Sequence, residues 1–151
     1  MKKIITIALS VLAFAAVASA QPRAIGLRIG GSAEATYQHS IGGNFIEGDL
    51  GLGILNGGGF YATGIYDFVI GSIDNFNFYA GPGLQMGLYN GVNDNAEKTT
   101  KFFFGLAGQV GFEWQFTSIP LNLSLDWRPG IDFCGAGFYW SSFALGVRYR
   151  F

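Results

Sequence analysis

The side chains best suited to catalysis are the single histidine, His39, the adjacent Ser40, and Glu47 a few residues later. A histidine that takes the proton of a serine hydroxyl creates a nucleophile, provided that both side chains lie within hydrogen-bond distance. In an extended strand, however, adjacent residues point to opposite faces of the sheet. His39 is therefore interpreted as a residue at a strand end, and no catalytic residue, metal or cofactor is predicted. HExxH, GxSxG and Gly-rich phosphate-loop motifs are also absent from the sequence.

Charged residues make up 13% of the 151 residues, where about 25% is usual in soluble globular proteins. Most of them alternate with apolar residues, so that in an extended chain they would share one face. We expect this face to be the inside of a barrel, where the charges form an ionic network. Its predicted members are Arg28, Glu34, Glu47, Asp49, Asp67, Glu113, Asp126, Arg128, Asp132, Arg148 and Arg150.

A period of two runs through the chain and predicts the strands that carry these charges. From Leu121 to Phe133, apolar residues at odd positions alternate with polar, charged or small residues. The same alternation recurs from Lys101 to Phe116 and from Phe138 to Phe151, where odd positions, Tyr139 included, form the apolar face. Strands of about 10–15 residues suit a tilted membrane strand better than the usual globular strand of about 5–6 residues.

Eight strands are predicted, antiparallel and connected up and down. Residues 24–39 could form one bent strand or two strands around Gly30-Gly31-Ser32, and the regularity of the chain favours two. Short turns are expected at Ser40–Asn44, Ile70–Asp74 and Thr117–Ile119 at one end. Among the connections at the other end, only Asn90–Thr100 is long and polar.

The distribution of charge decides between a membrane barrel and a soluble one. Placing the apolar face outward leaves no charge on that face within a strand, whereas an arginine or lysine there would cost about 2–4 kcal/mol at mid-bilayer. A soluble lipocalin-like barrel would have the reverse polarity, with an apolar interior. The fold class predicted is therefore an all-β, eight-stranded antiparallel transmembrane β-barrel.

The N-terminus resembles a cleaved signal peptide, with Lys2 and Lys3 before an apolar run and the small-residue site Ala18-Ser19-Ala20. Residues 1–20 are expected to be removed, which leaves residues 21–151 as the barrel domain. The mature chain then has 7 basic and 10 acidic residues, so it has no excess of positive charge for binding nucleic acid. Cys134 is the only cysteine, which excludes an intrachain disulfide.

The leader, the eight amphipathic strands and the terminal strand together resemble the small OmpX/OmpA-type outer-membrane β-barrel proteins of Gram-negative bacteria. The resemblance implies a location in the outer membrane among its lipids. It also implies recognition by the outer-membrane assembly machinery through alternate residues of the last strand. These residues are Phe143, Leu145, Val147, Tyr149 and Phe151.

An eight-stranded barrel is just wide enough for side chains to fill it, so the predicted function is a structural or surface-interaction role with a plugged lumen and no catalysis. The four arginines and seven acids of the network are expected to pair, with Asp126, Arg128, Asp132, Arg148 and Arg150 pairing across the last two strands. A monomer is expected, with an unknown surface ligand. Two alternatives remain open. One is a lipid A-modifying enzyme, as some barrels of this size are, and the other is a narrow ion or solute pore.

Overall fold

The structure is a computed structural model that describes residues 23–53, 58–92, 97–135, 137–140 and 142–151. The expected signal peptide lies outside these residues. No helix in the described part of the chain is long and apolar enough to cross a membrane. The strands are β1 (Arg23–Gly30), β2 (Ala33–Ile41), β3 (Asn44–Leu52), β4 (Gly59–Ile73), β5 (Phe76–Val92), β6 (Lys98–Gln115), β7 (Leu121–Trp127), β8 (Gly130–Asp132), β9 (Gly137–Tyr139) and β10 (Phe143–Arg150).

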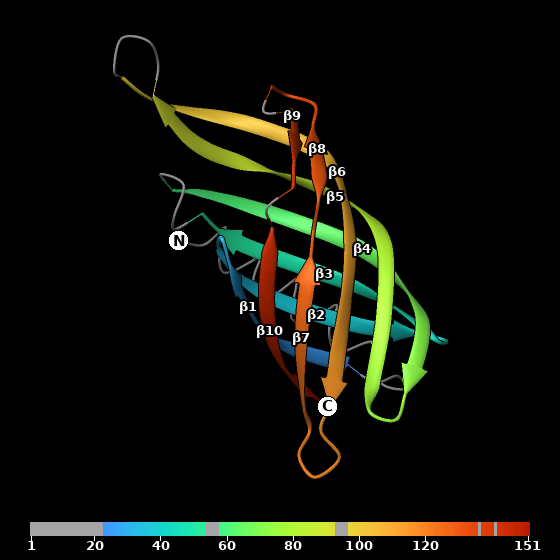
Figure 1. The fold of residues 1–151 in the computed structure, drawn as a ribbon. Helices are drawn as coiled ribbons and strands as arrows, with labels where there is room; N and C mark the ends of the chain where they lie inside the picture. The colour runs from blue at the N-terminus through green and yellow to red at the C-terminus, as the bar shows by residue number, and fades with distance from the viewer. Residues whose placement is uncertain (1–22, 54–57, 93–96, 136, 141) are drawn as a thin grey trace.

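These segments form one closed antiparallel sheet (Figure 1). Its order is β5-β4-β3-β2-β1-β10-β7-β6, and pairing of β5 with β6 closes the barrel. β8 continues β7 along β6, and β9 pairs with β8. One strand of the barrel is therefore formed by β7 and β8 together, and another by β9 and β10 together. The total is eight strands, which confirms the predicted eight-stranded barrel. β1 and β2 are two separate strands, which pair from Ile29 opposite Ala33. This confirms the favoured prediction of two strands rather than one bent strand.

Both ends of the described chain lie at one end of the barrel, where Ala24 pairs with Arg150. We call this the terminal end, and the opposite end the loop end. The turn predicted at Ile70–Asp74 is misplaced, because β4 continues to Ile73 and only Asp74 and Asn75 turn. Ile70 is an extra residue between pairs Val69–Tyr79 and Gly71–Phe78, so β4 has a bulge here, and pairing with β5 resumes beyond it as far as Ile73 opposite Phe76.

A second bulge changes the face of residues near the C-terminus. Trp127 pairs with Phe143, but Gly130 pairs with Tyr139, so the last strand gains one residue across this interval. The uninterrupted alternation predicted for 138–151 is therefore wrong for its first part. Tyr139 points into the barrel beside Gly130, whereas Phe138 is 49% and Trp140 63% exposed.

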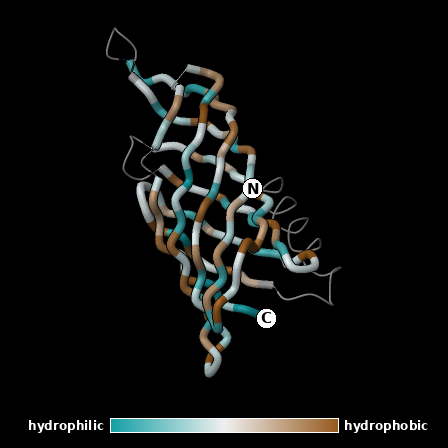
Figure 2. The backbone as a smooth tube through the Cα atoms, turned by 45° about the vertical axis from the view of Figure 1, so that its right-hand side comes forward, coloured by the Kyte–Doolittle hydropathy of each residue, from teal (hydrophilic) through white to brown (hydrophobic). Residues whose placement is uncertain are grey.

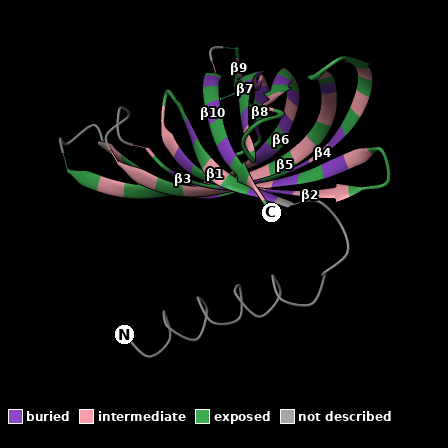
Figure 3. Ribbon diagram, turned by 90° about the horizontal axis from the view of Figure 1, so that it is seen from below, coloured by how far each residue is buried: buried purple, intermediate pink, exposed green. Residues whose placement is uncertain are grey.

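Burial alternates along the strands as their period of two requires (Figure 3). In β1, Leu27 is 60% exposed while the next residue, Arg28, is 1% exposed. Hydropathy alternates along the same strands (Figure 2), but with the polarity opposite to that of a soluble protein. Apolar side chains cover the outside, and most of the fully buried side chains are polar or charged.

Glycines make room for large polar side chains in the narrow interior, and Gly111 of β6 gives a test. A Cβ atom there would lie 2.5 Å from Asp126 Oδ1 and 2.7 Å from the Tyr79 hydroxyl oxygen. We expect Gly111→Val to destabilise the barrel by about 1–3 kcal/mol through overpacking, measured by urea unfolding in detergent. Gly64→Val is the control, because a Cβ at Gly64 meets nothing within 4 Å. Equal stability of the two variants would contradict a tightly filled interior.

Candidate functional site: the lumen and its mouth

Arg128 is the centre of the lumen network. It follows β7, at the break before β8, and its guanidinium crosses the barrel to acids on β2 and β3. Its nitrogens lie 3.3 Å from Glu34, 3.1 Å from Glu47 and 2.6 Å from Asp49. The side chain is 3% exposed, so these ion pairs are shielded from solvent and connect opposite walls of the barrel.

Two further arginines extend the network around the wall. Arg28 of β1 pairs with Glu34 at 2.9 Å and with Asp126 at 3.1 Å. Arg148 of β10 pairs with Glu47 at 2.9 Å. Glu47 thus serves two arginines and is itself fully buried. Each buried arginine therefore has at least one carboxylate partner, as buried charges generally require.

Neutral polar residues hold the carboxylates that the arginines do not fully satisfy. The Gln109 side-chain amide donates to Glu47 and Asp67 and accepts from Arg128. The Tyr79 hydroxyl donates to Asp126. Sequence reasoning from charge alone missed such residues, although they share the inward face of their strands. The set comprises Thr36, Gln38, Tyr79, Gln109, Asn122 and Ser124.

The terminal end of the lumen has a separate polar layer. Glu113 accepts hydrogen bonds from Asn77, Gln115 and Asn122. Arg150 donates to the Gln115 side chain at 2.9 Å and to the Phe116 carbonyl oxygen at 2.8 Å. No carboxylate is paired with Arg150 among the described residues.

The structure places all eleven predicted network residues on the inner face. Arg150 is half-buried, and the other ten are buried, with 0–7% exposed. The ion pairs of Arg128 and Arg148 differ, however, from the expected pairing across the last two strands. Arg128 pairs with acids of β2 and β3, and Arg148 pairs with Glu47 of β3. The reason is the small diameter of the barrel, which lets a long arginine reach the far wall as easily as a neighbouring strand.

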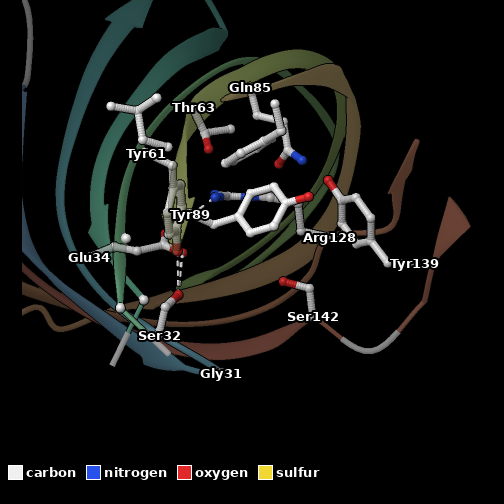
Figure 4. A pocket seen from close by; sticks show the side chains of 15 residues that line it. Gly31, Ser32, Glu34, Tyr61, Thr63, Gln85, Tyr89, Arg128, Tyr139 and Ser142 are labelled. Carbon is white, nitrogen blue, oxygen red and sulfur yellow. Dashed lines mark hydrogen bonds and ion pairs between the residues drawn. The ribbon is translucent and has the colours of Figure 1, made fainter. Parts of the chain in front are cut away.

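A pocket of about 330 Å³ lies above Arg128 at the loop end (Figure 4). Arg128 and Glu34 form part of its floor, and Tyr61 donates to Glu34 at 2.5 Å. The Tyr61 hydroxyl also bonds to Ser32. Aromatic and polar side chains from β4, β5, β6, β9 and the break between β9 and β10 line the rest of the pocket. They include Thr63, Gln85, Tyr89, Phe103, Tyr139 and Ser142.

The candidate catalytic side chains do not meet. His39 is half-buried at the terminal end, and its ring stacks with Tyr37 at a centroid distance of 6.4 Å. Glu47 is buried inside the barrel, where it binds Gln38 and arginines. His39 therefore lies on the opposite face of β2 from the residue that contacts Glu47. Among the described residues, no group of three or more His, Cys, Asp or Glu side chains could hold a metal ion.

The alternate residues of the last strand all lie on the outer surface. Phe143 is 62%, Leu145 63%, Val147 48%, Tyr149 51% and Phe151 61% exposed. β10 pairs with β1 on one side and with β7 on the other, so the backbone of this strand is part of the closed sheet. Only its apolar side chains remain available to a partner or to lipid.

No protein-family model and no curated protein sequence matches the chain. Two solved structures have a similar fold. The N-terminal β-barrel domain of Pseudomonas aeruginosa OprF aligns with a TM-score of 0.63 and 12% identity over 87% of this chain and 96% of that one. Neisserial surface protein A aligns with a TM-score of 0.53 and 14% identity over 87% and 94%. The chain therefore has the fold of the eight-stranded outer-membrane β-barrels, as its sequence predicted.

Proposed function

We propose that the protein is an integral barrel of the bacterial outer membrane, exported through a cleaved signal peptide at residues 1–20. The observation that supports this best is the reversed polarity of the barrel. Leucine, isoleucine, phenylalanine and tryptophan side chains cover the outside, far beyond the few hundred Å² of apolar patch that soluble monomers expose. A hydrocarbon solvent accounts for this surface, since the sheet closes on itself and each of β1 to β7 and β10 has a partner strand on both sides.

In this proposal the lumen is a plug rather than a channel. Six ion pairs among the described residues join Arg28, Arg128 and Arg148 to carboxylates around the wall. Because Arg128 bonds to acids on the far wall, its side chain lies across the path that an ion would follow. The role is then structural or one of surface interaction, carried by the loop end, which faces outward when both termini are periplasmic.

The outer surface of the last strand fits the proposed interaction with the outer-membrane assembly machinery. Phe143, Leu145, Val147, Tyr149 and Phe151 form a continuous apolar row at the C-terminus. After insertion the same row would contact lipid. Neither the fold nor the charges suggests a nucleic-acid partner, and the proposal treats the protein as a monomer.

The membrane proposal is tested by refolding the mature chain in detergent and by fractionating cells that express the full chain. We expect heat-modifiable gel migration, a β-rich circular dichroism spectrum, and recovery in the outer-membrane fraction with cleavage after Ala20. A protein that stays monomeric and soluble without detergent would overturn the proposal.

Two measurements separate the plugged barrel from its alternatives. Planar-bilayer recording of the purified protein is expected to show no stable conductance steps, and regular steps would favour a pore. Mass spectrometry of lipid A from cells with and without the protein is expected to show the same acylation. A change would favour an enzyme, despite the separation of His39 from Glu47 by the sheet.

A further inference from the structure

We propose that the pocket at the loop end binds a neutral sugar residue. This goes beyond the plugged barrel and rests on it, because the pocket meets an external ligand only if the loop end faces outward. The pocket volume of about 330 Å³ lies at the lower end of the range for small-molecule sites, about 300–1,000 Å³.

One wall of the pocket is aromatic. The Phe103 ring of β6 lies 6.4 Å from Tyr61 and 6.2 Å from Tyr89 between ring centroids. Tyr139 stands on another side of the pocket, with its hydroxyl directed toward Gln85 (Figure 4). These rings offer flat apolar faces together with hydroxyl groups at their edges, a combination enriched where ligands have one apolar and one polar side.

Thr63 supplies an independent sign of a ligand. This residue of β4 is 4% exposed, lines the pocket, and has a buried hydroxyl oxygen with no hydrogen-bond partner. Buried polar groups are nearly always bonded, and an exception calls for a partner such as a ligand or water. A hydroxyl both donates and accepts, so it matches the hydroxyl groups of a sugar.

The electrostatics of the floor favour a neutral ligand over an ion. Arg128 and Glu34 are the charged residues that line the pocket, and they already pair with each other at 3.3 Å. Arg128 also pairs with Glu47 and Asp49, so its charge is compensated from below. A phosphate or carboxylate would meet these three acids, whereas a sugar offers a C–H face to the rings and hydroxyl groups to Thr63, Gln85 and Ser32.

The test uses refolded full-length mature protein in lauryldimethylamine oxide, a detergent without a sugar headgroup, with heat-modifiable migration checked on each sample. Saturation-transfer NMR measures binding of maltose and, separately, of dephosphorylated core oligosaccharide released from lipopolysaccharide. Saturable binding of both would indicate free or surface sugars as the source. Binding of the oligosaccharide alone would indicate lipopolysaccharide itself.

Three variants connect binding to this pocket. Phe103→Ala is expected to weaken binding about two- to twelvefold. Phe102→Ala, the neighbouring residue on the outer face with 55% exposure, should leave binding unchanged. Thr63→Val should weaken binding by a similar factor without lowering stability, because its hydroxyl has no protein partner to lose.

The proposal is overturned if folded, heat-modifiable protein binds neither sugar, or if Phe103→Ala and Phe102→Ala bind equally well. It is also overturned if inorganic phosphate binds this pocket more tightly than maltose does. Absence of binding by a correctly folded sample leaves the membrane barrel itself intact, so the two proposals can fail separately.

Discussion

Replacing Arg128 with methionine is expected to lower the free energy of unfolding by about 3–5 kcal/mol, the usual cost of removing one partner from a buried ion pair. Methionine keeps an unbranched side chain that ends near the position of the arginine Nε, and it leaves Glu34, Glu47 and Asp49 without their shared cation. Urea unfolding of the refolded barrel in lipid vesicles, followed by tryptophan fluorescence, measures the change.

Arg150→Met is the matched control for this substitution. Arg150 is half-buried at the terminal end, where it donates hydrogen bonds to the neutral Gln115 side chain and to the Phe116 carbonyl oxygen. Its loss should cost about 0.5–1.5 kcal/mol per hydrogen bond. Arg128→Lys, which retains the charge, should have a stability between those of wild type and Arg128→Met. If Arg128→Met cannot be refolded, Arg128→Lys replaces it in the comparison and should still lose more stability than Arg150→Met. A cost for Arg128→Met no larger than for Arg150→Met would show that the network does not stabilise the barrel.

Introducing arginine on the outer face at Leu27 is expected to destabilise the barrel in lipid by about 2–4 kcal/mol. Leu27 lies in the middle of β1 and is 60% exposed. In hydrocarbon an arginine there loses its hydration, whereas in water an exposed leucine-to-arginine change would fall within about 0.5 kcal/mol of wild type. The same vesicle unfolding experiment measures the difference, so this variant separates a membrane barrel from a soluble one.

Ile41→Arg provides the position-dependent control. Ile41 ends β2 beside the turn at Gly42 and Gly43 and is 40% exposed. Near the membrane interface the cost of arginine falls to about 0–1 kcal/mol. If Leu27→Arg is as stable as Ile41→Arg, the outer face does not contact hydrocarbon.

The period of two was sufficient to predict the barrel and the inner position of the charges. Side chains alternate with every residue of a strand, so a charge such as Arg28 between Leu27 and Ile29 has its face determined locally. The same local information placed the C-terminal apolar residues outward. A prediction from this alternation fails where a bulge inserts a residue. Beyond the bulge, the residues that pointed outward point inward, although the types of residue in the sequence do not change. Tyr139 shows this, since an extra residue near the β9–β10 break turns it into the pocket.

The choice of ion-pair partners across the lumen is the other feature that the sequence of a single strand does not determine. The pairing of Arg128 with Glu34, Glu47 and Asp49 joins residues separated by more than 78 positions. Which carboxylate an arginine reaches depends on the register of the sheet and on the barrel diameter, and neither is encoded in a single strand. The pocket likewise exists only because strands distant in sequence meet at one rim. The sequence alone thus determined the fold class and the face of most residues, through strand periodicity. Barrel closure, the two bulges and the resulting distances decided the ion pairs and the pocket.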